Sequence, residues 1–242
     1  MKNKTNLTML TDFYELTMAN GYFETGMADD IAYFDMFFRR VPDGGGYAIM
    51  AGVEQMIEYL KNLEFTDEDI DYLRSKNIFC EEFLQYLRDF KFECDVWAIP
   101  EGTPIFPHEP IVTVRGPVMQ AQFVETMILL TINPQSLIAT KANRIVRAAK
   151  GRSVMEFGTR RAHGAEAAIF GARAAYIGGC AGTACAIADR DHGISALGTM
   201  AHSWVQMYPD ILLLRSMPKY TLKTVLFWLT HTMCLNQVFR QP

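Results

Sequence analysis

The sequence has no long apolar run and no concentration of basic residues. Its longest apolar stretches, residues 127–132 and 224–229, are far shorter than the roughly 20 residues that a membrane-spanning helix needs. The N-terminal Met-Lys-Asn-Lys-Thr is not followed by the apolar segment of a secretory signal. A net charge of −4 and a pI near 5.8 give no basic surface for nucleic acid or an anionic membrane. We therefore expect neither nucleic acid nor a membrane as a partner.

Cysteine is scarce, and its spacing follows no disulfide or metal pattern. The five cysteines are Cys80, Cys94, Cys180, Cys185 and Cys234, an odd number without a Cys-x-x-Cys pair. We therefore expect reduced thiols in a cytoplasmic protein, and no residue is assigned as a metal ligand. What the chain does have is an ordinary globular composition, with 242 residues, 50% of them hydrophobic and 21% charged. One or two domains with a sizeable core are expected.

The first 150 residues mix helical and extended patterns. Thr11 and Asp12 are capping residues ahead of a helix predicted over residues 12–23, whose first turn can present Tyr14 toward a site. A break is predicted at Asn133-Pro134, because proline disfavours helix in the residue before it. The remaining predicted elements are a strand over 31–38, helices over 48–60 and 67–87 (the second broken near Asn77), small antiparallel strands within 94–99, 104–106 and 111–114, and two helical segments within 120–149.

The pattern of predicted elements changes at Ser153. A strand is predicted over 154–157, a helix over 165–175, a loop over 178–183, a helix over 185–188 and a strand over 195–197. This alternation is typical of βα units in a barrel or a parallel sheet. Only about two such units precede Asp210, which is too few to close a barrel.

His202 lies in the turn sequence Gly198-Thr-Met-Ala-His-Ser-Trp204. A neutral imidazole is nucleophilic at cytoplasmic pH, and a histidine at the C-terminal end of a strand can receive a phosphoryl group from ATP. For an isolated histidine, a core residue hydrogen-bonded to the backbone is the more common outcome. Thr199, in the same turn, offers a hydroxyl and a backbone amide to a ligand.

Arg160 and Arg161 stand between a predicted strand and a predicted helix. Guanidinium groups in such a place can bind phosphate or carboxylate through two parallel hydrogen bonds. A surface ion pair is the usual alternative, but Gly158 and Gly164 on either side favour close approach of a ligand. His163 fits either interpretation and stays unassigned. Two further features, the glycine-rich loop 178–183 as an anion nest and the hairpin Glu101-Gly-Thr-Pro104, are weaker signals, and the hairpin is interpreted as structural.

Five blocks, in order along the chain, resemble the nicotinate phosphoribosyltransferase family. They are Leu10-Thr-Asp-Phe-Tyr-Glu-Leu-Thr-Met18, Trp97-Ala-Ile-Pro-Glu-Gly-Thr103, Leu137-Ile-Ala-Thr-Lys-Ala142, Glu156-Phe-Gly-Thr-Arg-Arg-Ala-His-Gly164 and Gly198–Met207. The resemblance implies an α/β fold, with an N-terminal α+β domain over residues 1–130. An irregular, incomplete α/β barrel of the type II phosphoribosyltransferase kind is expected to begin over residues 131–210.

The resemblance also implies a reaction and its participants. Nicotinate and phosphoribosyl pyrophosphate would form nicotinate mononucleotide and pyrophosphate, the first step of NAD synthesis from nicotinate. ATP hydrolysis would be coupled to transfer through phosphorylated His202, with Mg²⁺ on the phosphates. Tyr14, Arg160, Arg161 and Thr199 are the expected substrate-binding residues, Tyr14 by stacking on the pyridine ring. A homodimer is expected for an intact family member.

Alternatives remain at this point. Nicotinamide and quinolinate phosphoribosyltransferases share the fold, although the Gly198–Trp204 block together with Thr11-Asp-Phe-Tyr14 favours the nicotinate enzyme. A non-catalytic remnant that associates with an intact homologue is an alternative from another class.

The tail after about Asp210 departs from the resemblance. Regrouping the possible codons of residues 226–240 permits Val-Leu-Val-Asp-Thr-Tyr-Asp-Val-Leu-Glu-Ser-Gly-Val-Pro, which is similar to a barrel strand and Ser-Gly loop of the family. We therefore expect residues 211–242 to be an out-of-frame tail. A chain without the later barrel strands is expected to lack phosphoribosyl transfer on its own.

Overall fold

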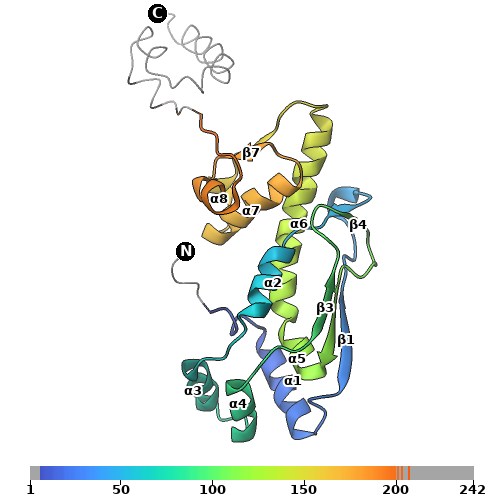
Figure 1. Cartoon of the computed structure of the whole chain (residues 1–242), viewed down its shortest axis with the longest axis vertical. Helices are drawn as coiled ribbons and strands as arrows, with labels where there is room; N and C mark the ends of the chain where they lie inside the picture. The colour runs from blue at the N-terminus through green and yellow to red at the C-terminus, as the bar shows by residue number, and fades with distance from the viewer. Residues whose placement is uncertain (1–5, 200, 202, 204–206, 208–242) are drawn as a thin grey trace, which may run out of the picture. The chain divides into compact units, whose positions relative to one another are not determined.

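The computed structural model of the chain describes residues 6–199, 201, 203 and 207, and Figure 1 shows the elements in colour order. The chain divides into two compact units, Met1–Ile194 and Ser195–Pro242. Residues 211–242, the predicted out-of-frame tail, lie outside the described residues. In the first unit the helices are α1 (Phe13–Glu24), α2 (Val53–Lys61), α3 (Asp67–Ser75), α4 (Glu81–Arg88), α5 (Val118–Phe123), α6 (Glu125–Ala148), α7 (Ala165–Ile177) and α8 (Ala186–His192). The strands are β1 (Ile31–Met36), β2 (Ala48–Ile49), β3 (Asp95–Ala98), β4 (Pro104–Ile105), β5 (Val112–Pro117), β6 (Met155–Glu156) and β7 (Gly182–Thr183), and Pro42–Gly44 (η1) and Thr159–Arg161 (η2) are single 3₁₀ turns.

Helix α6 is the central helix of this unit, and it packs against α2, β2 and α7 (Figure 1). Its 24 residues include Pro134, so the predicted break at Asn133-Pro134 is wrong. Ile132, Ser136 and Ala139 are buried at helical spacing on either side of the proline. Pro134 itself lies on the exposed face, and the interruption instead falls at Val124, between α5 and α6. Packing of the buried face therefore outweighs the local cost of proline.

The antiparallel sheet predicted from residues 94–114 is confirmed for β3 and β5, but β4 lies in a different sheet and β1 takes part instead, in the order β1-β5-β3. Arg115 of β5 pairs with Tyr33 of β1 and with Asp95 of β3. A second antiparallel pair joins β2 to β4, so the helix predicted from residue 48 begins only at Val53. Gly52 explains the boundary, because it has φ +102° and a Cβ there would come within 2.8 Å of the Thr131 carbonyl oxygen.

Two hydrophobic cores hold the N-terminal part together. One lies between the three-stranded sheet, α2 and α6, and includes Met56, Val112 and Ile132. The other joins α1, α3, α4 and α5 around a group of aromatic rings, of which Phe83 is fully buried. Phe90 and Phe123 pack edge to face in this second core, with ring centroids 5.7 Å apart.

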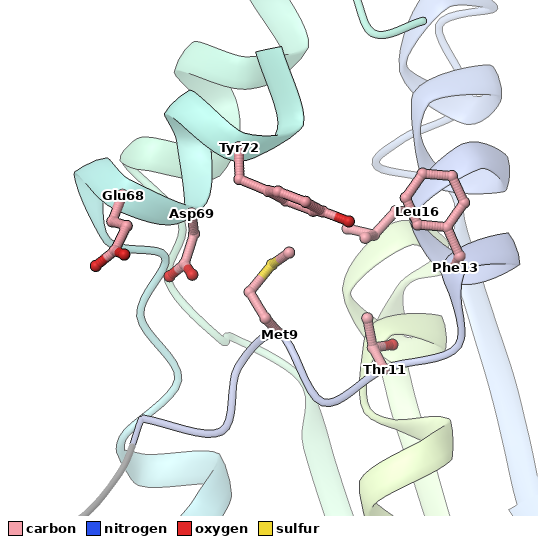
Figure 2. A pocket seen from close by; sticks show the side chains of 7 residues that line it. All are labelled: Met9, Thr11, Phe13, Leu16, Glu68, Asp69 and Tyr72. Carbon is pink, nitrogen blue, oxygen red and sulfur yellow. The ribbon is translucent and has the colours of Figure 1, made fainter. Parts of the chain in front are cut away.

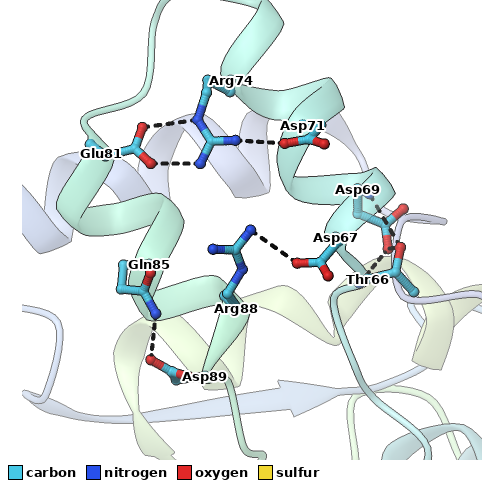
Figure 3. A network of polar contacts seen from close by, with 9 residues as sticks. All are labelled: Thr66, Asp67, Asp69, Asp71, Arg74, Glu81, Gln85, Arg88 and Asp89. Atoms are coloured by element: carbon cyan, nitrogen blue, oxygen red, sulfur yellow. Dashed lines mark hydrogen bonds and ion pairs between the residues drawn. The ribbon is translucent and has the colours of Figure 1, made fainter.

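The α3–α4 hairpin confirms the break predicted near Asn77. Asn77 has a φ of +56°, which ends the helical path between the two helices. Thr66 and Asp69 form a reciprocal capping box at the start of α3. Figure 3 shows Arg74 bound to both Asp71 and Glu81 on the outside of this hairpin. These ion pairs are exposed, so each contributes little to stability.

Residues 154–192 form the predicted βα arrangement. Strands β6 and β7 are parallel, with Met155 opposite Gly182 and Glu156 opposite Thr183, and α7 connects them. β7 lies within residues predicted as a loop, and the strand predicted over 195–197 is reduced to an isolated bridge at Ala196 in the part of the second unit that is described. Because α6 continues past residue 130, the division into domains at that point stays a prediction.

Candidate functional site

The carboxyl ends of β6 and β7 meet at one edge of the parallel pair, where Glu156 organises the backbone. The Glu156 carboxylate accepts a 2.6 Å hydrogen bond from the Thr183 hydroxyl and a further hydrogen bond from the Gly158 amide. The fully buried Thr183 hydroxyl also accepts a 2.9 Å hydrogen bond from the Cys185 amide. This network fixes the chain where it leaves both strands. Ligands of parallel α/β folds bind at such carboxyl edges.

Arg160 and Arg161 follow this edge in η2, whose turn is closed by a 2.7 Å bond from the Arg161 amide to the Gly158 carbonyl. Both side chains are exposed. In the part of the chain that the structure describes, neither guanidinium group has a hydrogen-bond or ion-pair partner. The surface ion pair considered from the sequence is not formed with any of the described residues. Their exposed donors are accessible to an anion.

Two neighbouring features also favour the binding of an anion near Arg160 and Arg161. The Thr159 hydroxyl is buried and has no hydrogen-bond partner among the described residues. Gly164, with a φ of +123°, is the N-cap residue that precedes α7, and no described side chain caps that helix end. Unpaired amides at a helix N-terminus attract anions. η2 packs directly against α7, so the arginines and this helix end belong to the same local assembly.

Tyr14 lies on α1, and its side chain is 44% exposed. Desolvation, followed by the charge of Glu125, raises the pKa of Tyr14 to about 12. The phenol is therefore neutral at physiological pH. Its surroundings are the N-terminus of α6, and among the described residues no hydrogen bond or ring contact joins it to Arg160 or Arg161. The structure does not bring these three predicted residues into one contact.

Thr199 and His202 belong to the second unit. Thr199 is exposed. His202 lies outside the described residues, so its predicted role stays a prediction. His163, which the sequence left unassigned, is exposed beside η2.

Arg173 on α7 and Glu101 form a polar link. The sequence indicates only a structural role for the hairpin that contains Glu101, and it does not indicate Arg173 as its partner. The Arg173 guanidinium donates to both Glu101 carboxylate oxygens, at 2.8 and 2.7 Å, and also pairs with Glu54. Glu101 accepts the amides of Gly52 and Val53 at the start of α2, at 2.6 and 3.0 Å. Burial by itself raises the pKa of Glu101, but the bond and charge of Arg173 outweigh it, so that this pKa lies below its usual value. The carboxylate thus ties α7 to α2.

The glycine-rich loop 178–183 has a packing explanation. A Cβ on Gly178 would lie 2.4 Å from the Ala139 carbonyl oxygen and 2.8 Å from the Ala142 Cβ. These glycines allow the end of α7 to approach α6 closely. Sequence reasoning missed Glu156, Thr159 and Thr183, although an acidic side chain at the end of the predicted strand 154–157 was a signal for the first.

A pocket of about 450 Å³ lies elsewhere, between the start of α1 and α3 (Figure 2). Met9, Phe13 and Leu16 form its apolar side, and Tyr72 and Asp69 lie across from them. Tyr14 is not part of its lining, and Asp69 already serves the cap of α3. This pocket is separate from the edge of β6 and β7.

The described residues contain no group of three or more His, Cys, Asp or Glu side chains that could hold a metal ion. They also contain no helix with the length and apolar character required to cross a membrane. Near Arg160 and Arg161 the described residues offer hydrogen-bond donors for an anion.

Comparison with known proteins decides the family. The sequence profile of the nicotinate phosphoribosyltransferase (NAPRTase) N-terminal domain matches residues 9–133. This chain belongs to the nicotinate phosphoribosyltransferase family. A nicotinate phosphoribosyltransferase of Mycobacterium tuberculosis is 47% identical over 200 residues, which cover 83% of this chain and 43% of that protein. One of Bacillus subtilis is 44% identical over 205 residues, covering 85% and 42% of the two chains.

The fold agrees with this assignment. The crystal structure of human nicotinic acid phosphoribosyltransferase matches with a TM-score of 0.76 and 35% identity, over 82% of this chain and 40% of that one. The expected architecture, an α+β N-terminal part followed by the beginning of a type II phosphoribosyltransferase barrel, is confirmed. Members of this nicotinate phosphoribosyltransferase family are enzymes. The chain spans about two fifths of the length of the curated relatives it matches.

Proposed function

We propose that this nicotinate phosphoribosyltransferase chain carries the anion-binding side of the family's active site. The observation that carries this proposal is the open pair Arg160 and Arg161 at the carboxyl edge of β6 and β7. Nicotinate is a carboxylate and phosphoribosyl pyrophosphate is a polyanion, so both suit two exposed guanidinium groups. The unpartnered hydroxyl of Thr159 and the open start of α7 support the same site.

The proposed reaction joins nicotinate to phosphoribosyl pyrophosphate. The ring nitrogen of nicotinate attacks the anomeric carbon, the bond to pyrophosphate breaks, and nicotinate mononucleotide forms. Arg160 and Arg161 hold an anionic group, while Tyr14 stacks on the pyridine ring and Thr199 offers a hydrogen bond, so that the nucleophile is aimed. Arginine donors also stabilise charge on the departing pyrophosphate.

ATP enters through His202 in this proposal. An imidazole nitrogen attacks the γ-phosphorus, the bond to ADP breaks, and water later releases phosphate from the phosphohistidine. Mg²⁺ would neutralise charge on the substrate phosphates. The donor set of the described residues does not form a site for that ion, so no step is assigned to it.

The setting of the reaction is also proposed. We infer that an intact family member is a cytoplasmic homodimer that makes nicotinate mononucleotide for NAD synthesis. This chain, without the later barrel strands, is expected to lack that activity on its own. Free thiols at all four described cysteines support a reducing location, and exposed Leu130 and Ile145 on α6 support a partner subunit. The division into residues 1–130 and 131–210 is part of the proposal.

Nicotinate binding to the purified 242-residue chain tests the function. Arg161→Ala should weaken binding by about tenfold to a hundredfold, because a charge-assisted hydrogen bond contributes about 1.5–3 kcal/mol. Arg160→Ala should act in the same direction. Titration calorimetry with nicotinate measures both variants.

Arg152→Ala is the matched control, since Arg152 is an exposed arginine before β6, away from the carboxyl edge. Its affinity should equal that of the unsubstituted chain. Absence of nicotinate binding, or equal affinity in the Arg160, Arg161 and Arg152 variants, would contradict the proposed site.

A further inference from the structure

The chain around Tyr14 changes from exposed to buried within one residue. Tyr14 is 44% exposed, whereas the adjacent Glu15 is 0% and Leu16 is 1% exposed. A fully buried carboxyl group is unusual, because removing a carboxylate from water is costly unless hydrogen bonds or a cation compensate. Glu15 therefore requires a physical explanation.

The contacts of Glu15 join two segments that are far apart in the sequence. One carboxylate oxygen accepts the Thr126 hydroxyl at 2.7 Å and the Thr126 amide at 3.2 Å. The other accepts the Thr11 hydroxyl. The Thr126 hydroxyl in turn accepts the Asp12 amide at 3.2 Å. These bonds attach the turn of residues 11–15 to the N-terminus of α6 from both sides.

No cation compensates Glu15 among the residues that the structure describes. The charged groups that face it are the carboxylates of Asp12, next to α1, and Glu125, on α6. From α2, the Tyr59 hydroxyl faces it, buried and without a hydrogen-bond partner. Among the described residues, Glu15 is compensated by the Thr11 hydroxyl and by the amide and hydroxyl of Thr126 at the start of α6, where the helix dipole favours negative charge. An apolar residue would fill the same space without this cost, so simple packing does not account for a carboxyl group.

We propose that Glu15 is a positioning residue for Tyr14, holding the Tyr14 ring at the start of α6 through Thr126. The proposal rests on the substrate-binding role proposed for Tyr14. Tyr14 is adjacent to Glu15 on α1 and lies near Glu125, the residue preceding Thr126, so displacement of this turn from α6 moves the ring away from Glu125. Glu15 touches no substrate in this arrangement and acts only through Tyr14.

The test follows Tyr14 directly in the full 242-residue chain. The chain is labelled with ¹³Cζ-tyrosine, and Tyr14→Phe identifies the Tyr14 NMR signal. Glu15→Gln should shift this signal and raise the hydrogen-exchange rates of the Asp12 and Thr126 amides at least tenfold. Thr126→Val, which removes only the bridging hydroxyl, should shift the Tyr14 signal in the same direction and shows the effect even where Glu15→Gln folds poorly.

Asp69→Asn is the matched control, because Asp69 is also a carboxylate that accepts a hydrogen bond at a helix start, in the capping box of α3. It should lower stability without moving the Tyr14 signal. An unshifted Tyr14 signal in Glu15→Gln and Thr126→Val would overturn the positioning role.

Nicotinate affinity separates this inference from the proposed function. A shifted Tyr14 signal with nicotinate binding at least fivefold weaker in Glu15→Gln supports both. A shifted signal in a chain that never binds nicotinate supports the positioning role and contradicts the proposed function. Unchanged affinity in Glu15→Gln, with tight binding by the unsubstituted chain, overturns the positioning role alone.

Discussion

The N-terminal part of the first unit, residues 6–124, and the βα part, residues 153–194, are stabilised by different means. The first buries large side chains, with Phe83, Leu84, Met56 and Ile70 among those at 1% exposure or less. The second is held by small clusters in which alanine and cysteine predominate, such as Ala172, Cys185 and Ala188. Burial of large apolar side chains supplies most of the stabilisation in a domain. The N-terminal part therefore has a large hydrophobic core of its own, whereas the stability of the βα part depends on its contacts with neighbouring elements.

The βα part obtains its position from close backbone approach and one polar link. Gly178 lets α7 approach α6, and Arg173 ties α7 to Glu101 and α2. At the same time Phe157, Tyr176 and Ile187 remain exposed at 42% to 50%. The candidate anion site thus stands on the part with the smaller core. Loss of the Arg173–Glu101 link should therefore change the candidate anion site more than the overall fold.

The largest expected effect is in the N-terminal core. Phe83→Ala removes a fully buried ring and should lower the free energy of unfolding by about 3–5 kcal/mol, because a cavity adds to the lost transfer energy. Urea unfolding followed by circular dichroism measures the change. Phe106→Ala, at a 48% exposed phenylalanine, should cost far less. Similar losses in the two variants would contradict the importance of this core.

A smaller effect is expected at the link between the two parts. Arg173→Ala leaves the 19% exposed Glu101 carboxylate with the Gly52 and Val53 amides but without its cation, and should cost about 2–3 kcal/mol, less than the 3–5 kcal/mol of a fully buried pair. Hydrogen exchange followed by mass spectrometry should show faster exchange in α7 and β6 than in α3 and α4. Arg190→Ala, which breaks the exposed pair with Asp191, is the control and should change little. Uniform exchange across both parts would mean that this link does not position α7.

The smallest expected effect is a pH dependence confined to the N-terminal part. Burial raises the pKa of Glu15 to about 7 from 4.5, while Thr126 hydrogen bonds lower it and the charges of Glu125 and Asp12 add to the rise. The folded state therefore binds more protons than the unfolded state between these values, and the contribution of Glu15 to stability falls as the pH rises from about 4.5 to 7. The loss should be on the order of 2 kcal/mol.

Urea unfolding of the unsubstituted chain and of Glu15→Gln between pH 4.5 and 8 measures this contribution as a difference. The difference in unfolding free energy between the two proteins should change from pH 4.5 to 7 and be constant above pH 7.5, since the variant has no proton to lose at this position. A difference that stays constant from pH 4.5 to 8 would show that Glu15 does not change its charge there.

The elements that local chemistry controls were predicted correctly. The helix predicted over residues 12–23 is α1, although Asp12 makes no side-chain cap there, and Asn77 divides α3 from α4. The strand predicted over 31–38 is β1, and the β-rich runs near residues 94–114 include β3 and β5. The Arg160-Arg161 pair was placed between a strand and a helix, which is where it lies. These predictions succeeded because caps, turns and periodicity act over a few neighbouring residues.

By itself the sequence determined the family, the order of most elements and the identity of the arginine pair. Only the tertiary structure decided that α6 continues through Pro134, because its buried face is packed before and after the proline. Only the tertiary structure likewise joined Glu15 to Thr126 and Arg173 to Glu101, which are 111 and 72 residues apart. No local pattern encodes such pairs, because their stabilisation arises from burial and hydrogen bonding between segments that the fold brings together.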